Sequence, residues 1–306
     1  MRSHGGSFVP RSVEPVFPIR MLALDLDGTL VGDDLVLGDR TRAVIAGALR
    51  AGVQVSIVTG RMATSALRFA DALALEGPIV ACQGAIVRAM PAPGTSRVGR
   101  LLYHEPLLAE VARETIAWSH AHGLDPHVNH LERIVIRADD PEVDDYSAFL
   151  GGRAVLVPDL IAAIVRPVTK VIAVGEAPGP TNILERAREH FRDRASVTVS
   201  HPRFLEFLSP GVSKGRAVRW LARRQGVPLG QVLAIGDQMN DLEMVAAVGH
   251  GVAMSTAPAP VLAAARYIAP AVGDEGAAQV IESLVLSGHD GVPRSAGRFL
   301  AGLGAA

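Results

Sequence analysis

The chain has 306 residues, 49% of them hydrophobic, which is enough for two hydrophobic cores. Its 30 basic and 31 acidic side chains give a formal net charge of −1, so no overall field recruits nucleic acid or an anionic membrane, and we expect neither partner. One cysteine excludes an internal disulfide framework and, with no apolar run near the ~18 residues of a membrane span, predicts a cytoplasmic protein.

The first part of the chain alternates between strands and helices. A flexible extension over residues 1–17, rich in Gly, Ser, Pro and Arg, comes before the first apolar run. The predicted elements are then a strand over Met21–Leu24, a helix over Asp39–Arg50 with Asp39 as its N-cap, a strand over Val53–Val58, a helix over Met62–Leu73 and a strand over Ile79–Ala81. This alternation predicts a parallel sheet with right-handed crossovers.

From about Ile86 the elements become shorter and less regular. Those predicted here are strands near Arg100–Tyr103 and Ile134–Ile136, a helix near Leu107–His120 and a strand–helix pair over Val168–Phe191. The earlier rhythm resumes after Phe204, with a helix near Lys214–Arg224, a strand over Val232–Ile235, a helix after Asn240 and a strand over Gly251–Met254. We therefore predict a discontinuous, doubly wound α/β core over residues 18–85 plus 200–286, an inserted α/β domain over residues 86–199, and a weakly ordered tail over residues 287–306.

Two carboxylates, Asp25 and Asp27, follow the first predicted strand and enter a Gly-Thr turn. Ligands of open α/β sheets bind just beyond the carboxyl ends of the strands. Like charges on a partly buried turn repel and lose hydration, so a divalent cation is their simplest compensation. The alternative is a solvated Asp-x-Asp-Gly turn, because Asp and Gly are ordinary turn residues.

A second acidic pair, Asp237 and Asp241, follows the apolar strand that ends at Ile235. If the two strands are neighbours, the four aspartates meet in one oxygen-rich site suited to Mg²⁺, which prefers carboxylates, waters and substrate phosphate. Taken alone, Asp237 and Asp241 are equally well explained as a helix N-cap and a first-turn partner of the helix dipole.

Thr59 and Lys214 are candidates for binding an anion. The Thr59 hydroxyl and the backbone N–H groups that follow it at the end of a strand can hold a phosphoryl oxygen, although a simple strand-end turn also explains them. Lys214 stands at a predicted helix start, where the helix dipole disfavours a cation by roughly 0.3–1 kcal/mol, so pairing with phosphate and aspartate is a plausible role beside that of a solvated surface lysine.

Four motifs in this order resemble those of the haloacid dehalogenase-like hydrolase superfamily and, more narrowly, of the Cof-type phosphatases. They are Asp25-Leu26-Asp27-Gly28-Thr29, Thr59-Gly60-Arg61, Lys214 and Gly236-Asp237-Gln238-Met239-Asn240-Asp241, and the resemblance spans about Arg20 to Leu286.

The resemblance implies a role for each matched residue. Asp25 would be the nucleophile that becomes an aspartyl-phosphate, and Asp27 the general acid and base. Thr59 and Lys214 would bind the transferring phosphoryl group. The phosphate and substrate site implied in this way comprises Thr59, Gly60, Arg61, Gln83, Gly84, Lys214 and Asn240. Mg²⁺ would be held by Asp25, the Asp27 carbonyl and Asp237, with Asp241 as an additional acidic partner.

Spacing places the inserted domain without reference to the family. The stretch between Asp25 and Thr59 has room for one crossover helix, whereas that between Thr59 and Lys214 is far longer than one strand–helix unit. The insertion therefore lies between the second and third motifs. In the resembling family this is the cap that closes over the active site and recognises the leaving group.

Several cap residues are candidate substrate contacts. His120, His122, His127 and His130 at a helix end and the following loop predict a polar cap face, with one or two of them reaching the substrate, rather than a zinc site. The acidic stretch over residues 139–145 predicts a solvated loop, and Lys170 an outward-facing strand residue. Gln83-Gly84-Ala85, Ser255-Thr256-Ala257 and Ala271-Val272 depart from the usual Cof pattern, so the family's substrate preference does not transfer.

The sequence therefore predicts a Mg²⁺-dependent phosphatase that hydrolyses a small phosphorylated metabolite, such as a sugar phosphate, through an aspartyl-phosphate on Asp25. The alternatives are a phosphotransferase or phosphosugar mutase of the same superfamily, and a non-catalytic module that binds a phosphorylated metabolite. A dinucleotide-binding dehydrogenase is disfavoured because no Gly-x-Gly-x-x-Gly motif follows a predicted strand. The substrate, the oligomeric state and any protein partner stay open.

Overall fold

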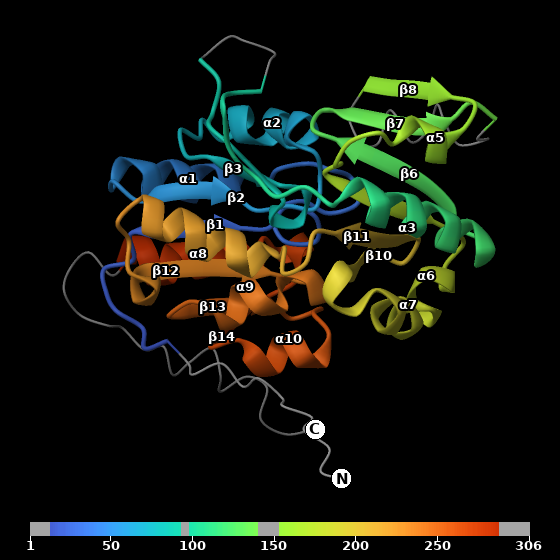
Figure 1. Cartoon of the computed structure of the whole chain (residues 1–306). Coiled ribbons are helices and arrows are strands. Elements are labelled where there is room, and N and C mark those ends of the chain that lie inside the picture. The colour runs from blue at the N-terminus through green and yellow to red at the C-terminus, as the bar shows by residue number, and fades with distance from the viewer. Residues whose placement is uncertain (1–12, 93–97, 140–152, 288–306) are drawn as a thin grey trace.

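The structure is a computed structural model that describes residues 13–92, 98–139 and 153–287, and it contains two large sheets and a small third one (Figure 1). The predictions for residues 1–12 and 288–306, and for most of the acidic stretch 139–145, lie outside the described residues. The described end of the N-terminal extension packs on the core: the Val16 N–H donates to the Gly230 carbonyl at 2.8 Å, and the Phe17 ring lies 4.7 Å from that of His250.

The core sheet has five parallel strands in the order β14-β13-β12-β1-β2, which confirms the predicted doubly wound α/β core. Its strands are β1 (Met21–Leu24), β2 (Gln54–Ile57), β12 (Val232–Gly236), β13 (His250–Met254) and β14 (Tyr267–Ala269). Side chains alternate across a strand. In β1, Leu22 and Leu24 therefore pack into one apolar cluster, and Met21 and Ala23 into another on the opposite face.

Helices cover both faces of this sheet. Residues of α1 (Asp39–Arg50), α2 (Ala63–Ala72) and α11 (Gly276–Ile281) share the cluster of Leu22 and Leu24, whereas residues of α8 (Lys214–Arg224) and α9 (Leu242–Ala246) share that of Met21 and Ala23. A short helix, α10 (Ala259–Ala264), lies between β13 and β14 in the chain. Each fully buried Leu, Ile, Val or Met side chain contributes about 1.5–3 kcal/mol to this layered arrangement.

The predicted N-cap of α1 is wrong by one residue. The N-cap is Gly38, and Asp39 lies in the first turn. Glu275 takes over the capping role from far along the chain, because its carboxylate accepts the Thr41 N–H at 2.7 Å and the Thr41 hydroxyl at 2.8 Å. A Cβ on Gly38 would meet this carboxylate at 2.1 Å, so a larger residue there would displace the Glu275 cap.

The inserted domain is built on a six-stranded sheet in the order β10-β11-β9-β6-β7-β8, which confirms the predicted α/β insertion between the second and third motifs (Figure 1). Its strands are β6 (Asp125–His130), β7 (Arg133–Arg137), β8 (Arg153–Val157), β9 (Lys170–Val174), β10 (Ser196–His201) and β11 (Phe204–Leu208), and its helices are α3 (Ala109–Ala121), α5 (Leu160–Ala163), α6 (Gly179–Asn182) and α7 (Leu184–Phe191). The rings of Trp118, Phe191 and Phe207 meet edge to face at 5.2–5.9 Å in its core.

The expected domain boundary at residues 199/200 falls inside β10. The sheet continues through β11, which pairs antiparallel with both β10 and β9. We therefore propose that the chain returns to the core after Leu208. A third sheet, of β3 (Ile79–Ala81), β4 (Ile86–Arg88) and β5 (Leu101–His104), is linked to the core sheet by a parallel bridge between Val58 and Val80.

Two of the four cap histidines lie at a helix end as expected, and the other two lie in a strand and not in a loop. His120 is in the last turn of α3 and His122 is its C-cap, whereas His127 and His130 belong to strand β6 and not to a loop. The apolar pattern missed this strand because Pro126 and polar residues interrupt it. None of the helices within residues 13–92, 98–139 and 153–287 is both long and apolar enough to cross a membrane.

Candidate active site

The carboxyl ends of β1 and β12 bring three aspartates together. Leu24 pairs with Ile235 in register, so Asp25 and Asp237 follow neighbouring strands at the same edge of the sheet. Asp241, in the short 3₁₀ turn that follows β12, completes the group. One carboxylate oxygen of each residue lies within 4.8 Å of the others, and all three residues are buried.

Lys214 partly neutralises this group. Its ammonium donates to Asp25 Oδ1 at 2.6 Å and to Asp241 Oδ1 at 2.7 Å, and its side chain is 1% exposed. The residue is placed by the start of α8, where the Ser213 hydroxyl accepts the Arg216 N–H at 3.0 Å as an N-cap. The lysine that the helix dipole disfavours at this position is thus held by two buried carboxylates.

The electrostatics of the group favour a further cation. Burial, followed by the nearby Asp241, raises the pKa of Asp25 well above its usual range despite the opposing Lys214, and the same two causes raise the pKa of Asp237 to about 6. Although burial acts against the ammonium, Asp241 and Asp25 raise the pKa of Lys214. Three carboxylates beside one ammonium carry two net negative charges when all are ionised. Their hard oxygen atoms fit Mg²⁺.

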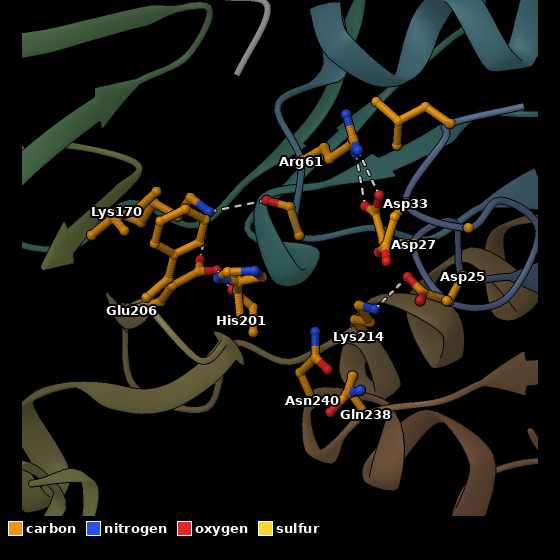
Figure 2. A pocket seen from close by; sticks show the side chains of 17 residues that line it. Asp25, Asp27, Asp33, Arg61, Lys170, His201, Glu206, Lys214, Gln238 and Asn240 are labelled. Atoms are coloured by element: carbon orange, nitrogen blue, oxygen red, sulfur yellow. Dashed lines mark hydrogen bonds and ion pairs between the residues drawn. The ribbon is translucent and has the colours of Figure 1, made fainter. Parts of the chain in front are cut away.

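Asp27 points away from this group. Arg61 holds its carboxylate through two hydrogen bonds, from Nε to Oδ2 at 2.7 Å and from Nη2 to Oδ1 at 2.5 Å (Figure 2). The Asp27 side chain is 47% exposed, whereas that of Arg61 is 6% exposed. Asp27 is therefore a candidate for proton transfer at the edge of the site, and its carboxylate takes no part in the acidic group.

Three further predicted site residues, Thr59, Gln83 and Gly84, are buried near the Gly60–Arg61 segment. Thr59 is fully buried, and its hydroxyl accepts the Arg61 N–H at 3.1 Å. Gln83 is buried beside Gly60, where a Cβ would meet its Nε2 atom at 2.4 Å. Gly84 has a φ of +98°, and a Cβ there would lie 2.4 Å from the Ser213 carbonyl oxygen. Glycine is thus required at position 84, where both the φ and the backbone contact exclude a side chain, whereas a Cβ at position 60 would displace the end of the Gln83 side chain.

A cavity of about 340 Å³ lies between this end of the core sheet and the cap (Figure 2). Of the predicted site residues, those that line it are Asp25, Asp27, Gly60, Arg61, Lys214 and Asn240. Thr59, Gln83, Gly84, Asp237 and Asp241 are not part of its lining. A larger cavity of about 890 Å³ lies alongside, lined among others by Gln83, Lys214 and Asn240. The smaller cavity is the candidate site because Asp25 and Asp27 both open onto it.

Cap residues form the far wall of the cavity, and the sequence interpretation missed them. They are Lys170, Ile172, Ser200, His201, Phe204 and Glu206. Lys170 does not face outward as predicted: it is 2% exposed, because Val171 fills the cap core and the residues on either side of it point to the opposite face. The sequence offered one signal, since the chain contains only two lysines and the other, Lys214, was already a candidate site residue.

Known proteins resemble this chain over most of its length. A family profile described as haloacid dehalogenase-like hydrolase matches residues 22–281. The chain belongs to this family. The expected enzyme of the phosphatase class is confirmed as well, since relatives of the family include the HMP-PP phosphatase of Cronobacter sakazakii, 29% identical over 83% of this chain and 90% of that protein.

Solved structures of the family agree with the fold. A haloacid dehalogenase-like hydrolase from Bacteroides thetaiotaomicron is 26% identical, with a TM-score of 0.74 over 87% of this chain and 99% of that chain. TM0651 from Thermotoga maritima is 27% identical, with a TM-score of 0.71 over 87% of this chain and 97% of that chain.

Proposed function

We propose that the protein is a Mg²⁺-dependent phosphatase that hydrolyses a small phosphorylated metabolite through an aspartyl-phosphate on Asp25. The observation that carries the proposal is the Asp25 carboxylate itself, which is buried at the wall of the cavity, held by Lys214 and grouped with two further aspartates. The HMP-PP phosphatase relative supports the reaction class, and a sugar phosphate or similar phosphomonoester is the proposed substrate.

The chain's own residues provide for two steps. In the first, an Asp25 oxygen attacks phosphorus, the bond from phosphorus to the leaving oxygen breaks, and Asp27 gives its proton to that oxygen. In the second, Asp27 takes a proton from a water molecule that attacks the aspartyl-phosphate, which releases phosphate and restores Asp25. General acid–base catalysis of this kind contributes about 10²–10⁴-fold.

Other groups hold the phosphoryl oxygens. Lys214 lines the cavity and offers a third proton beyond the two that it gives to Asp25 and Asp241. The proposed binding partners on the opposite side are the Thr59 hydroxyl and the Gly60–Arg61 backbone. Mg²⁺, held by Asp25, the Asp27 carbonyl and Asp237, would neutralise phosphate charge and draw electrons from phosphorus. We assign Asp241 a supporting role, since it already accepts hydrogen bonds from Lys214 and from the N–H groups of Asp237 and Gln238.

The size of the cavity limits the leaving group. About 340 Å³ is near the lower end of the roughly 300–1,000 Å³ range of small-molecule pockets. A monosaccharide-sized leaving group therefore fits the proposal better than a polymer or a phosphoprotein. The predicted location in the cytoplasm is part of the same proposal.

The test is the Asp25→Asn variant, which replaces the attacking oxygen with a poor nucleophile of nearly the same shape. We expect a folded protein without turnover of p-nitrophenyl phosphate, whereas the matched Glu185→Gln variant, at an exposed surface ion pair, retains it. Retained turnover in Asp25→Asn would refute the mechanism. Product analysis separates the two enzymes: free phosphate supports a phosphatase, and interconversion of sugar phosphate isomers supports a mutase. Calorimetric binding of phosphorylated metabolites with no Mg²⁺-dependent turnover supports a binding module.

A further inference from the structure

The two lysines of the chain are both buried and paired with carboxylates, and they line the cavity from opposite sides. Lys214 belongs to the core, and Lys170 lies on strand β9 of the cap. Both are almost completely buried, at 1% and 2% exposure, and both line the cavity. A buried ammonium is costly unless it is paired, so the partners of Lys170 define its role.

Lys170 bonds to the cap and the core at once. Its Nζ atom donates to Glu206 Oε2, on neighbouring strand β11, at 2.5 Å and to the Gly60 carbonyl oxygen, in the core, at 2.9 Å (Figure 2). The Lys170–Glu206 ion pair is buried on both sides, with side chains 2% and 3% exposed. The cap thus reaches the second motif of the core through a single charged atom.

Glu206 extends this connection to a second core loop. Its Oε1 atom accepts hydrogen bonds from the Ser200 hydroxyl and, at 3.0 Å, from Gln83 Nε2. Gln83 Oε1 in turn accepts the Asn240 Nδ2 donor at 2.9 Å. A continuous chain of hydrogen bonds therefore runs from the cap ion pair to the loop that carries the fourth motif.

The contact with Gly60 fixes the orientation of one peptide group. The carbonyl oxygen of the Gly60–Arg61 peptide accepts the Lys170 ammonium, and the N–H of the same peptide donates to Thr59 Oγ1 at 3.1 Å. Because a peptide group is planar, holding one end orients the other. The Thr59 hydroxyl and the Arg61 side chain, which grips Asp27, both depend on this orientation.

We propose that Lys170 and Glu206 are a positioning pair, which orders the Thr59–Arg61 loop when the cap is seated on the core. The pair acts through the loop and needs no contact with the substrate. It makes the phosphoryl site complete only in the seated arrangement, so turnover is coupled to the position of the cap. This inference rests on the proposed phosphatase function.

The test uses the double variant Lys170→Met with Glu206→Gln. Methionine keeps most of the length of the lysine side chain without the ammonium, and glutamine avoids the unpaired buried carboxylate that Lys170→Met alone would leave. The side-chain oxygen of the glutamine that replaces Glu206 can still accept the hydrogen bond from Gln83, so the variant removes the ion pair and the bond with Gly60 and leaves the link to Gln83 in place. Glu189→Gln, which removes an exposed carboxylate from the same domain, is the matched control.

Two substrates separate positioning from recognition of the leaving group. We expect the double variant to lose about 10–100-fold in kcat on both p-nitrophenyl phosphate and glucose 6-phosphate, with a small change in KM, because the misplaced loop serves the phosphoryl group that they share. A loss confined to glucose 6-phosphate would overturn the proposal, since it would assign the pair to the leaving group. Full retention of kcat on both substrates would overturn it as well.

Hydrogen–deuterium exchange provides a readout without turnover. We expect faster exchange in the Thr59–Arg61 loop of the double variant, with the cap sheet and the control unchanged. Faster exchange throughout β9 and β11 would indicate a merely structural pair and would contradict the proposal, as would an unchanged loop. If the wild-type protein hydrolyses no phosphate ester, the proposed function fails, and the exchange experiment still decides whether the pair orders the loop.

Discussion

The Asp237 carboxyl links Mg²⁺ binding to pH and to stability. Burial and the neighbouring Asp241 raise its pKa from 3.8 to about 6 in the folded protein. Without a divalent cation, the native state keeps this proton between about pH 4 and pH 6, where the unfolded chain has lost it. Stability therefore falls as pH rises through this window, by up to about 3 kcal/mol at 1.36 kcal/mol per pKa unit. The raised pKa of Asp25 acts in the same direction.

A cation bound by the ionised carboxylates reverses this trend. At pH 7.5, Mg²⁺ at 100 times its Kd should stabilise the protein by about 2.7 kcal/mol. At pH 5, one unit below the pKa of Asp237, removal of its proton costs about 1.4 kcal/mol, so the apparent Kd for Mg²⁺ should be about ten-fold weaker. Asp25 would steepen this dependence.

The assay is thermal unfolding at pH 5 and pH 7.5, with either Mg²⁺ or EDTA present. At each pH, the difference between the unfolding midpoints in Mg²⁺ and in EDTA cancels the contribution of titrating groups that do not bind the metal. These groups include His104 and His201, whose pKa values are lowered mainly by burial. In Asp237→Asn the Mg²⁺-dependent difference should largely disappear at both pH values. A Mg²⁺-dependent shift of the unfolding midpoint that is equal at pH 5 and pH 7.5 in the wild type, or undiminished in Asp237→Asn, would refute the reasoning.

Three further variants test the contacts that hold the site residues in place. Lys214→Met leaves buried carboxylates without their counter-charge, so urea unfolding should show a loss of about 3–5 kcal/mol, part of which Mg²⁺ restores; an unchanged midpoint would contradict the ion-pair assignment. Gly28→Ala places a Cβ 2.2 Å from Asp237 Oδ2, at a backbone φ of +80° that only glycine adopts readily. Because the Asp237 carboxylate must then move, calorimetry should show at least about ten-fold weaker Mg²⁺ binding, whereas wild-type affinity would exclude Asp237 as a ligand. Ser213→Ala removes the N-cap of α8 and should cost about 1 kcal/mol in the same unfolding assay, with turnover reduced if the helix start positions Lys214.

Local patterns predicted most core elements closely. The helix over Lys214–Arg224 and the short strand Ile79–Ala81 lie where they were predicted, and the helix over Asp39–Arg50 ends as predicted but has Gly38 and not Asp39 as its N-cap. These segments have regular patterns because one side of each packs on the sheet. In the cap, β6, β8, β10 and β11 were missed. In β6 and β10 polar residues interrupt the alternation that marks a strand, and some of those in β10 face the cavity.

The core side of the candidate site was predicted in part from the sequence, whereas the cap side was not. Asp25 and Asp237 could be placed together because each follows a recognisable buried strand, and the structure brings them together with Asp241. The cap wall could not be placed, because the face to which a strand residue points depends on what each side of the sheet covers. Lys170 shows the difficulty: the residues that follow it in β9 are all apolar, and the pattern alone does not tell which face is buried.

By itself, the sequence determined the doubly wound core, the inserted domain and the ends of the strands that carry the aspartates, because these depend on short-range apolar patterns and on the order of motifs along the chain. Only the tertiary structure decided which charged groups meet: Arg61 with Asp27, Lys214 with Asp25, and Lys170 with Glu206 and the Gly60 carbonyl. Most of these partners come from segments far apart in the chain. Their pairing follows from burial, since a charge taken out of water must find its partner wherever the fold places one.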